Sequence, residues 1–178
     1  MRSVFFMSSY HFRTTEGNSR KQVTPYRLLK VSYISVVDWH QKTDLIHVHP
    51  NFHGHEQQDC VLVAAGNDEY FFAQLLYVFG VFVTNETRHM ALIMPMDERI
   101  PRDERVQSDK TFRFRRVRAR HISDTAFIDV ESIVRGAILV KASDSENHDE
   151  FIPFNVIDED MWWRMKSAKL TSHPVQLE

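Results

Sequence analysis

The stretch "YFFAQLLYVFGVFVTNETRHMALIMPM", residues 70–96, decides the fold class. Its two apolar runs, residues 70–83 and 89–96, are rich in aromatic and aliphatic side chains, and the polar residues "TNETR" separate them. Two such runs joined by a short polar connection predict an antiparallel β-hairpin. The first run is shorter than the roughly 20 residues of a membrane-spanning helix, and Gln74 and Gly80 interrupt it. We therefore expect a buried hairpin and no membrane partner.

Strand-like segments flank this hairpin on both sides. In "YRLLKVSYISVVDW", residues 26–39, alternation places five side chains on one face of an extended chain: Leu29, Val31, Tyr33, Val37 and Trp39. The following "DWHQKTD" indicates a turn, and "DCVLVAA" from Asp59 indicates a buried strand. Later strands are expected at residues 112–120, where a β-bulge absorbs a doubled arginine, at residues 137–140 after a helical turn near "DVES", and in "FIPFNVI".

The carboxy-terminal part of this pattern carries one helix signal. In "DEDMWWRMK", Asp158 can cap a helix, and Arg164 and Lys166 near its end complement the helix dipole. Short strands with one short helix predict a mainly β fold: a small antiparallel barrel, SH3-like or BAH-like (bromo-adjacent-homology-like), or a bent sheet. We expect residues 1–24 to form a polar, flexible arm, residues 25–166 a single β-rich domain, and residues 167–178 a flexible tail.

The composition excludes several function classes. The chain has 178 residues, of which 43% are hydrophobic, and this is enough to build a core for one domain. The formal net charge of -2 argues against a globally basic nucleic-acid-binding protein. Cys60 is the single cysteine, so no internal disulfide forms. Because residues 1–12 lack the pattern of a signal peptide, we expect an intracellular protein, nuclear or cytoplasmic, that is not secreted.

The segment "HVHPNFHGH", residues 47–55, raises the question of a metal site. Four histidines lie in this segment: His47, His49, His53 and His55. Imidazoles are zinc ligands, and such a site would support a metal-dependent hydrolase. Their spacing matches no standard zinc pattern, however. The alternative, which we favour, is a structured loop in which Pro50 and Gly54 shape a turn and the imidazoles bond to backbone or solvent.

The segment "KTFRFRRVRAR", residues 110–120, concentrates positive charge in six side chains: Lys110, Arg113, Arg115, Arg116, Arg118 and Arg120. An arginine ridge on one strand face could contact phosphates, so a nucleic-acid-binding module is the second function to consider. The other interpretation is a strand face on which the arginines pair with neighbouring acids. The slightly acidic net charge favours this paired interpretation.

Two further features bear on catalysis and on partners. Cys60 lies in an apolar strand signal, where a cysteine is typically a small buried hydrophobe rather than a nucleophile. The sequence contains no Gly-rich phosphate loop, nucleophile elbow or HExxH helix, so we expect neither catalysis nor a cofactor. Trp162 and Trp163 cannot both face inward from one helix, and one of them is therefore a candidate contact for a partner.

The order of these segments resembles a region of fungal DNA-transposon proteins of the Plavaka and Kyakuja-Dileera-Zisupton type. The similarity covers residues 26–166, and its most specific positions are His49, Pro50, Phe52, His53, Gly54, Asp59, Gly136, Asp158 and Asp160. The resemblance implies an accessory β-domain that lacks the acidic triad of the transposase core. It therefore implies a non-catalytic module that engages protein or chromatin. His47 and His55 lie outside the pattern, which weakens a four-histidine metal site further.

Overall fold

The computed structural model describes residues 3–9, 23–52, 55–66, 69–83, 85–98, 109, 111, 114–142, 149–154, 158–167 and 169–170. Strands dominate this part of the chain: β1 (Ser3–Ser9), β2 (Val23–Ile34), β3 (Gln41–Phe52), β4 (His55–Gln58), β5 (Cys60–Gly66), β6 (Glu69–Val83), β7 (Glu86–Asp97), β8 (Val117–Ala119), β9 (Ala126–Asp129), β10 (Ile133–Ala137), β11 (Leu139–Lys141), β12 (Glu150–Pro153) and β13 (Lys169–Leu170). Two 3-10 turns, η2 (Ile122–Asp124) and η3 (Val130–Ser132), and the helix α2 (Glu159–Ser167) complete it.

The expected hairpin is the centre of the sheet. β6 and β7 pair in antiparallel register from Phe72 opposite Met96 to Val83 opposite Glu86. The connection is tighter than the expected five residues, because β6 ends at Val83 and β7 begins at Glu86. Asn85 in this connection adopts a positive φ of 69°, which asparagine tolerates better than most residues. The hairpin prediction is confirmed.

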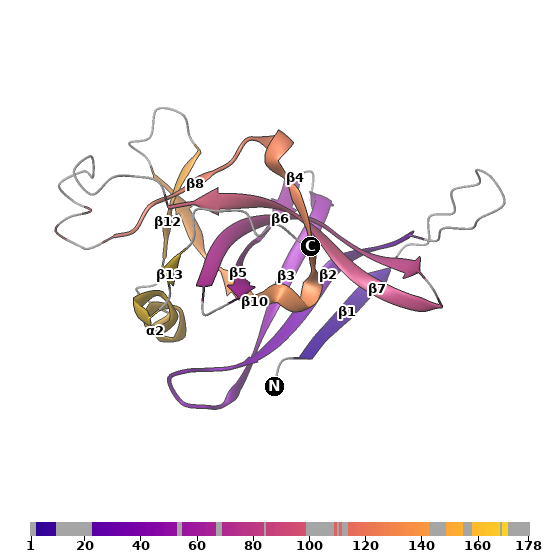
Figure 1. Ribbon diagram of the computed structural model, residues 1–178, viewed down its shortest axis with the longest axis horizontal. Coiled ribbons are helices and arrows are strands. Elements are labelled where there is room, and N and C mark those ends of the chain that lie inside the picture. Colours follow the sequence, from indigo (N-terminus) through magenta and orange to yellow (C-terminus); the bar gives the residue numbers. More distant parts are fainter. Residues whose placement is uncertain are drawn as a thin grey trace.

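The sheet bends because two different strands pair with the two halves of the same edge of β6. β5 pairs with the first half of β6, and β2 pairs with its second half from Val78 to Val81. A register irregularity between Leu75 and Tyr77, on the opposite edge of β6 where it faces β7, marks the bend. β3 then adds to β2, and β10 adds to β5 (Figure 1). The main path of strands, β11-β12-β8-β7-β6-β2-β3-β4, stays open.

These pairings confirm the expected mainly β fold in its bent-sheet form, with a short carboxy-terminal helix. One apolar cluster fills the space between the β2–β3 and β5–β10 parts of the sheet, and Leu29, Ile46 and Ile133 in it are fully or almost fully buried. A second cluster, which includes Phe72, Val134 and Met161, lies beneath α2. No helix in the described residues is long and apolar enough to cross a membrane.

The end of β2 differs from the sequence expectation. β2 stops at Ile34, and the chain turns through residues 36–38 before β3 begins. The Asp38 carboxylate accepts a hydrogen bond from the His40 N–H at 3.1 Å, a contact that favours the turn. Val37 and Trp39 are consequently 39% and 77% exposed, so the expectation that they share one strand face with Leu29, Val31 and Tyr33 is wrong.

Several other boundaries also differ. Ser3–Ser9 forms β1 and pairs with β2, although we expected a polar arm. The sequence did not predict this strand, because the apolar run Val4–Met7 is short, lies between serines and carries little periodicity. β13 pairs with β6 within the expected flexible tail. The arginine-rich strand is limited to β8, and the strand expected at residues 137–140 is interrupted at Ile138, between β10 and β11. The helical turn near "DVES" is confirmed as η3.

Candidate binding groove beside strand β3

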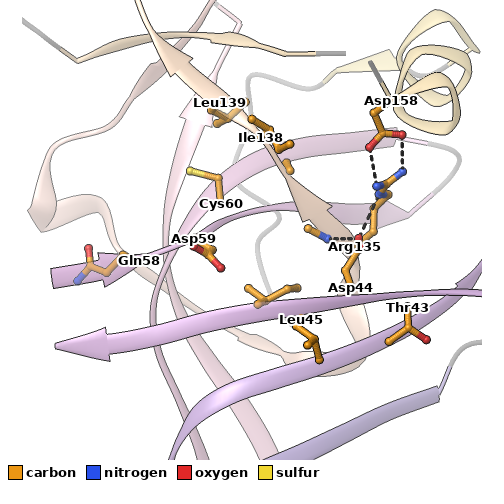
Figure 2. A pocket seen from close by; sticks show the side chains of 13 residues that line it. Thr43, Asp44, Leu45, Gln58, Asp59, Cys60, Arg135, Ile138, Leu139 and Asp158 are labelled. Atoms are coloured by element: carbon orange, nitrogen blue, oxygen red, sulfur yellow. Dashed lines mark hydrogen bonds and ion pairs between the residues drawn. The ribbon is translucent and has the colours of Figure 1, made fainter. Parts of the chain in front are cut away.

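An open groove of about 660 Å³ separates β3 from the β10–β11 segment (Figure 2). Its walls come from three parts of the chain: Thr43, Asp44, Leu45 and Ile46 of β3, Gln58, Asp59 and Cys60 where β4 passes into β5, and Arg135, Gly136, Ala137, Ile138 and Leu139, with Asp158 at one end. A cavity of this size accommodates several residues of an extended peptide or a small molecule.

The outer edge of β3 along this groove carries backbone groups without a strand partner. The His47 N–H donates to Asp59 Oδ2 at 2.7 Å, and the His47 carbonyl accepts from the Asp59 N–H at 3.1 Å, so both groups point away from β2. Backbone direction alternates along an antiparallel strand. The N–H and C=O groups of Thr43 and Leu45 therefore also point away from β2. Among the described residues no strand pairs with them there, and we call these groups the β3 edge.

A single side chain keeps β3 and β10 apart. Asp44 Oδ2 accepts a hydrogen bond from the Gly136 N–H at 2.9 Å, so a carboxylate lies where a neighbouring strand would offer a carbonyl. Paired strands lie about 4.8 Å apart, which leaves no room for an intervening side chain. The Asp44 contact therefore separates the two strands and leaves the groove between them.

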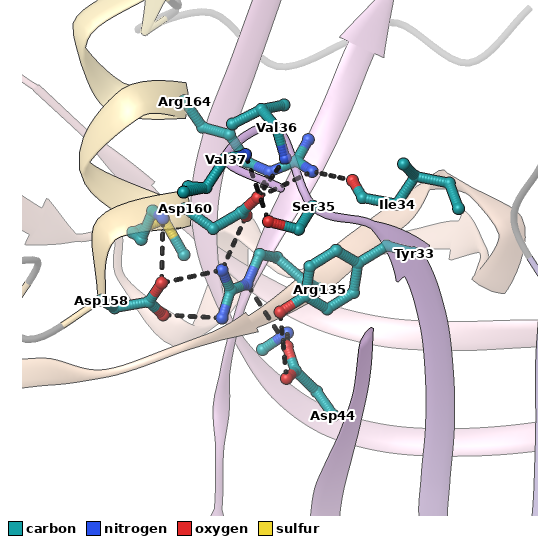
Figure 3. A network of polar contacts seen from close by, with 12 residues as sticks. Tyr33, Ile34, Ser35, Val36, Val37, Asp44, Arg135, Asp158, Asp160 and Arg164 are labelled. Atoms are coloured by element: carbon teal, nitrogen blue, oxygen red, sulfur yellow. Dashed lines mark hydrogen bonds and ion pairs between the residues drawn. The ribbon is translucent and has the colours of Figure 1, made fainter. Parts of the chain in front are cut away.

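Arg135 anchors the end of the groove where α2 begins (Figure 3). Its side chain is 7% exposed. Its two terminal nitrogens donate to Asp158 at 2.6 and 3.1 Å and to Asp160 at 2.8 Å, and Nε lies 3.3 Å from Asp44 Oδ2. The guanidinium also stacks 4.7 Å from the centroid of the Tyr33 ring. Because a buried cation needs compensating charge, this cluster binds β3, β10 and α2 to one another.

Asp160 and Arg164 connect the helix to the end of β2. Asp160 Oδ1 accepts from the Val36 N–H at 2.6 Å, and Arg164 donates to the Ile34 carbonyl at 2.7 Å. Burial disfavours the charged form of Asp160, but hydrogen bonds from Arg164 and the Val36 N–H outweigh it and lower the pKa of Asp160. Asp158 caps α2 through a 2.9 Å hydrogen bond from the Met161 N–H, which is the role that the sequence indicated.

The groove lining and the ion pairs at its α2 end together carry an excess of negative charge. Asp44, Asp59 and Asp158 of the lining, with Asp160 behind it, outnumber the two guanidinium groups of Arg135 and Arg164. Burial raises the pKa of Asp44, although the charge of Arg135 and the Gly136 N–H lower it in part. Burial also raises the pKa of Tyr33 against the opposing effect of Arg135, so its hydroxyl stays neutral and donates to Asp44 at 3.4 Å.

The histidine segment forms strand rather than loop where the structure describes it. Residues 47–52 continue β3, residues 55–58 form β4, and the two pair antiparallel, with His49 opposite Gln57 and Phe52 opposite His55. Pro50 lies within β3, and His53 and Gly54 lie outside the described residues. His47 Nδ1 lies 3.1 Å from Asp59 Oδ2. In the described part of the chain, no three His, Cys, Asp or Glu side chains are grouped so as to hold a metal ion.

Cys60 begins β5 at the wall of the groove. Burial, with a smaller contribution from the charge of Asp59, raises the pKa of its thiol to about 12. Each pKa unit reduces the thiolate fraction about tenfold. We therefore expect alkylation by iodoacetamide at pH 8 to be about a thousandfold slower than for a free cysteine. Mass spectrometry over time checks this rate, with protein unfolded in urea as the fast control. Equal rates for folded and unfolded protein would contradict a half-buried, protonated Cys60.

The arginines of residues 110–120 contact carboxylates wherever the structure describes them. Arg115 binds Glu98, Arg120 binds Asp97, and Arg118 binds Glu150. Arg116 is buried and binds both Asp109 and Glu150. Lys110 and Arg113 lie outside the described residues. The four described arginines therefore serve as one side of an ion-pair network that joins β7, β8 and β12.

Trp162 and Trp163 lie together on the exposed side of α2. They are 41% and 43% exposed, and their rings meet edge to face with 4.8 Å between centroids. The Lys166 ammonium lies 4.9 Å from each ring centroid. The helix instead turns Met161 and Met165 toward the sheet, where both are buried. Both tryptophans thus remain accessible to a partner.

Sequence reasoning identified only part of this site. It singled out Asp59, Gly136, Asp158 and Asp160 through the resemblance, and all four lie in or next to the groove. It assigned no role to Arg135 or Asp44, which hold the groove together. The available signal was Arg135 itself, because an arginine within the apolar run "SIVRGAILV" requires buried carboxylate partners.

Comparisons with known proteins do not assign this chain to a family. No protein-family model, curated protein or solved structure matches the chain.

Proposed function

We propose that this chain is a non-catalytic interaction module that binds an extended segment of a partner protein, such as a chromatin protein, at the β3 edge. The observation that carries the proposal is the coincidence of the groove with the backbone groups of Thr43 and Leu45, with which no strand of the described part of the chain pairs on that side. Extended peptides add to exposed sheet edges, where main-chain hydrogen bonds supply affinity and neighbouring pockets supply specificity. The resemblance to an accessory region of transposon proteins points to the same class of function, inside the cell.

The other functions considered from the sequence have less support. The four described arginines of residues 110–120 already contact carboxylates, which reduces their attraction for phosphates. A hydrolase using the histidine segment would need converging ligands, and His47 binds Asp59 within the β3–β5 connection instead. The raised pKa of Cys60 opposes nucleophilic catalysis at the groove.

The test of this function uses proline at the β3 edge. Because the Leu45 N–H points away from β2, Leu45→Pro removes one edge donor while leaving the β2–β3 ladder intact. Peptides selected from a random phage-displayed library against the full chain should bind Leu45→Pro at least about tenfold more weakly. Leu45→Ala, which keeps the N–H and removes the side chain, should stay within about threefold.

Fluorescence anisotropy with the selected peptides measures both variants, and far-UV circular dichroism checks that each is folded. Selected peptides that bind Leu45→Pro as tightly as the unaltered chain would contradict recognition at the β3 edge. A library that yields no peptide at all would contradict the proposed function itself.

A further inference from the structure

We infer that the occupant of this groove is a basic peptide, which adds to the β3 edge as an extra strand with its lysine or arginine side chains directed into the groove. This inference rests on the proposed function and names the chemistry of its partner. This groove combines three separate observations: backbone groups that pair with no described strand, an adjoining cavity, and an excess of carboxylates. Each constrains a different property of the occupant.

The backbone of β3 sets the conformation of the occupant. Thr43 and Leu45 each present one N–H donor and one C=O acceptor on the same side of the strand, two residues apart. An extended chain repeats its own donors and acceptors with the same period of two. A strand therefore satisfies all four groups, whereas a helix, whose backbone groups are already bonded internally, does not.

The strand pairing also fixes which side chains of the occupant enter the groove. Residues directly opposite one another in a sheet share a face. Asp44 and Ile46 point toward Gly136 and the core, so occupant residues opposite these two enter the groove. The intermediate residues lie beside the exposed Leu45 and face solvent. The groove thus selects alternate side chains of the bound segment.

The charges around the groove determine which alternate side chains fit. Asp44 and Asp158 are shared with Arg135, but the four carboxylates still outnumber the two guanidinium groups. Asp59 uses only Oδ2 for His47, and Oδ1 has no partner among the described residues, while its side chain is 33% exposed. An ammonium or guanidinium group entering the groove finds this acceptor, whereas a carboxylate is repelled.

The experiment compares two matched octapeptides labelled with fluorescein. One alternates lysine with threonine, and the other alternates glutamate with threonine, so that both favour the extended conformation and differ only in charge. By fluorescence anisotropy in low salt, the lysine peptide should bind the full chain at least about tenfold more tightly than the glutamate peptide. Its affinity should fall as salt is raised, because the contacts are partly exposed.

Two variants separate charge from edge pairing. Asp59→Asn keeps an acceptor for His47 and removes the negative charge. The affinity for the lysine peptide should therefore fall about threefold to tenfold, and the affinity for the glutamate peptide should not fall. Leu45→Pro should abolish binding of the lysine peptide, while Leu45→Ala should not. Equal affinity for the two peptides would overturn the basic occupant and leave the proposed function standing.

A second copy of this chain is the competing occupant of the same edge. Sedimentation equilibrium of the unaltered chain should show a monomer at micromolar concentration. A dimer that Leu45→Pro dissociates would show that β3 pairs with β3 of another copy, which would overturn the inference. If Leu45→Pro changes the affinity for neither octapeptide and for no library-selected peptide, then recognition at the β3 edge is contradicted as a whole.

Discussion

Replacing Arg135 with methionine is expected to lower the free energy of unfolding by about 3–5 kcal/mol, the loss typical when one partner of a buried ion pair is removed. The Arg135 side chain is 7% exposed, and its guanidinium contacts Asp158 and Asp160 directly. Methionine fills much of the volume but leaves these carboxylates, with Asp44, without their common cation. Urea denaturation followed by circular dichroism measures the change, and the midpoint should fall at unchanged slope.

Arg118→Met provides the matched control for this variant. Arg118 also contacts two carboxylates, Asp149 and Glu150, but its side chain is 45% exposed. Exposed ion pairs contribute about 0–1 kcal/mol, so the control should lose at most that amount. Similar losses for Arg135→Met and Arg118→Met would show that the buried cluster does not hold β10 to α2.

Phe72→Ala is the second substitution with a large expected effect. Phe72 lies on β6, is 1% exposed and packs in the cluster beneath α2, with Met161 and Met165 of the helix. Removing a buried phenylalanine costs about 3–5 kcal/mol, through lost transfer free energy and the cavity that remains. We expect this loss in urea denaturation, together with a change in tryptophan fluorescence, because Trp162 and Trp163 are carried by the helix that loses its support.

Phe82→Ala on the same strand is the control for Phe72→Ala. Phe82 is 50% exposed, and substitutions at such positions usually change stability by no more than about 0.5 kcal/mol. The difference between the two phenylalanines therefore reports the packing beneath α2 alone. Should Phe72→Ala be as mild as Phe82→Ala, then the second apolar cluster does not support the helix.

The sequence predicted the parts of the fold that depend on local pattern. The β6–β7 hairpin is encoded in two apolar runs and the short connection between them, and Asp158 caps α2 through a contact three residues away. Such interactions are visible in a short window of sequence. The helical turn at Val130–Ser132 is local in the same sense, because Asp129 accepts from the Glu131 N–H.

The groove depends instead on residues far apart in the chain. Asp44 and Gly136 are separated by 92 positions, and Val36 and Asp160 by 124. Periodicity indicates that a segment is a strand, but it does not indicate which strand lies at an edge or which carboxylate reaches a buried arginine. Trp39 shows the same limit, since alternation placed it on one strand face with Leu29 and Val31, while the turn at residues 36–38 leaves it exposed.

Stability and binding are therefore linked at one position. Asp44 holds β3 away from β10 through the Gly136 N–H and contributes to the charge around Arg135. The same carboxylate separates the strands, compensates the buried cation and is one of the acidic groups of the groove. No described strand has to be displaced before a partner strand pairs with Thr43 and Leu45.

Amide hydrogen exchange at four consecutive residues of β3 tests the β3 edge most directly. In the free protein the amides of Thr43 and Leu45 should exchange fast and those of Asp44 and Ile46 slowly, because the latter pair with β2. Adding the lysine–threonine octapeptide should slow Thr43 and Leu45 at least about tenfold and leave their neighbours unchanged. Equal protection of all four amides in the free protein, or no change on adding the peptide, would contradict an open strand edge that binds a partner.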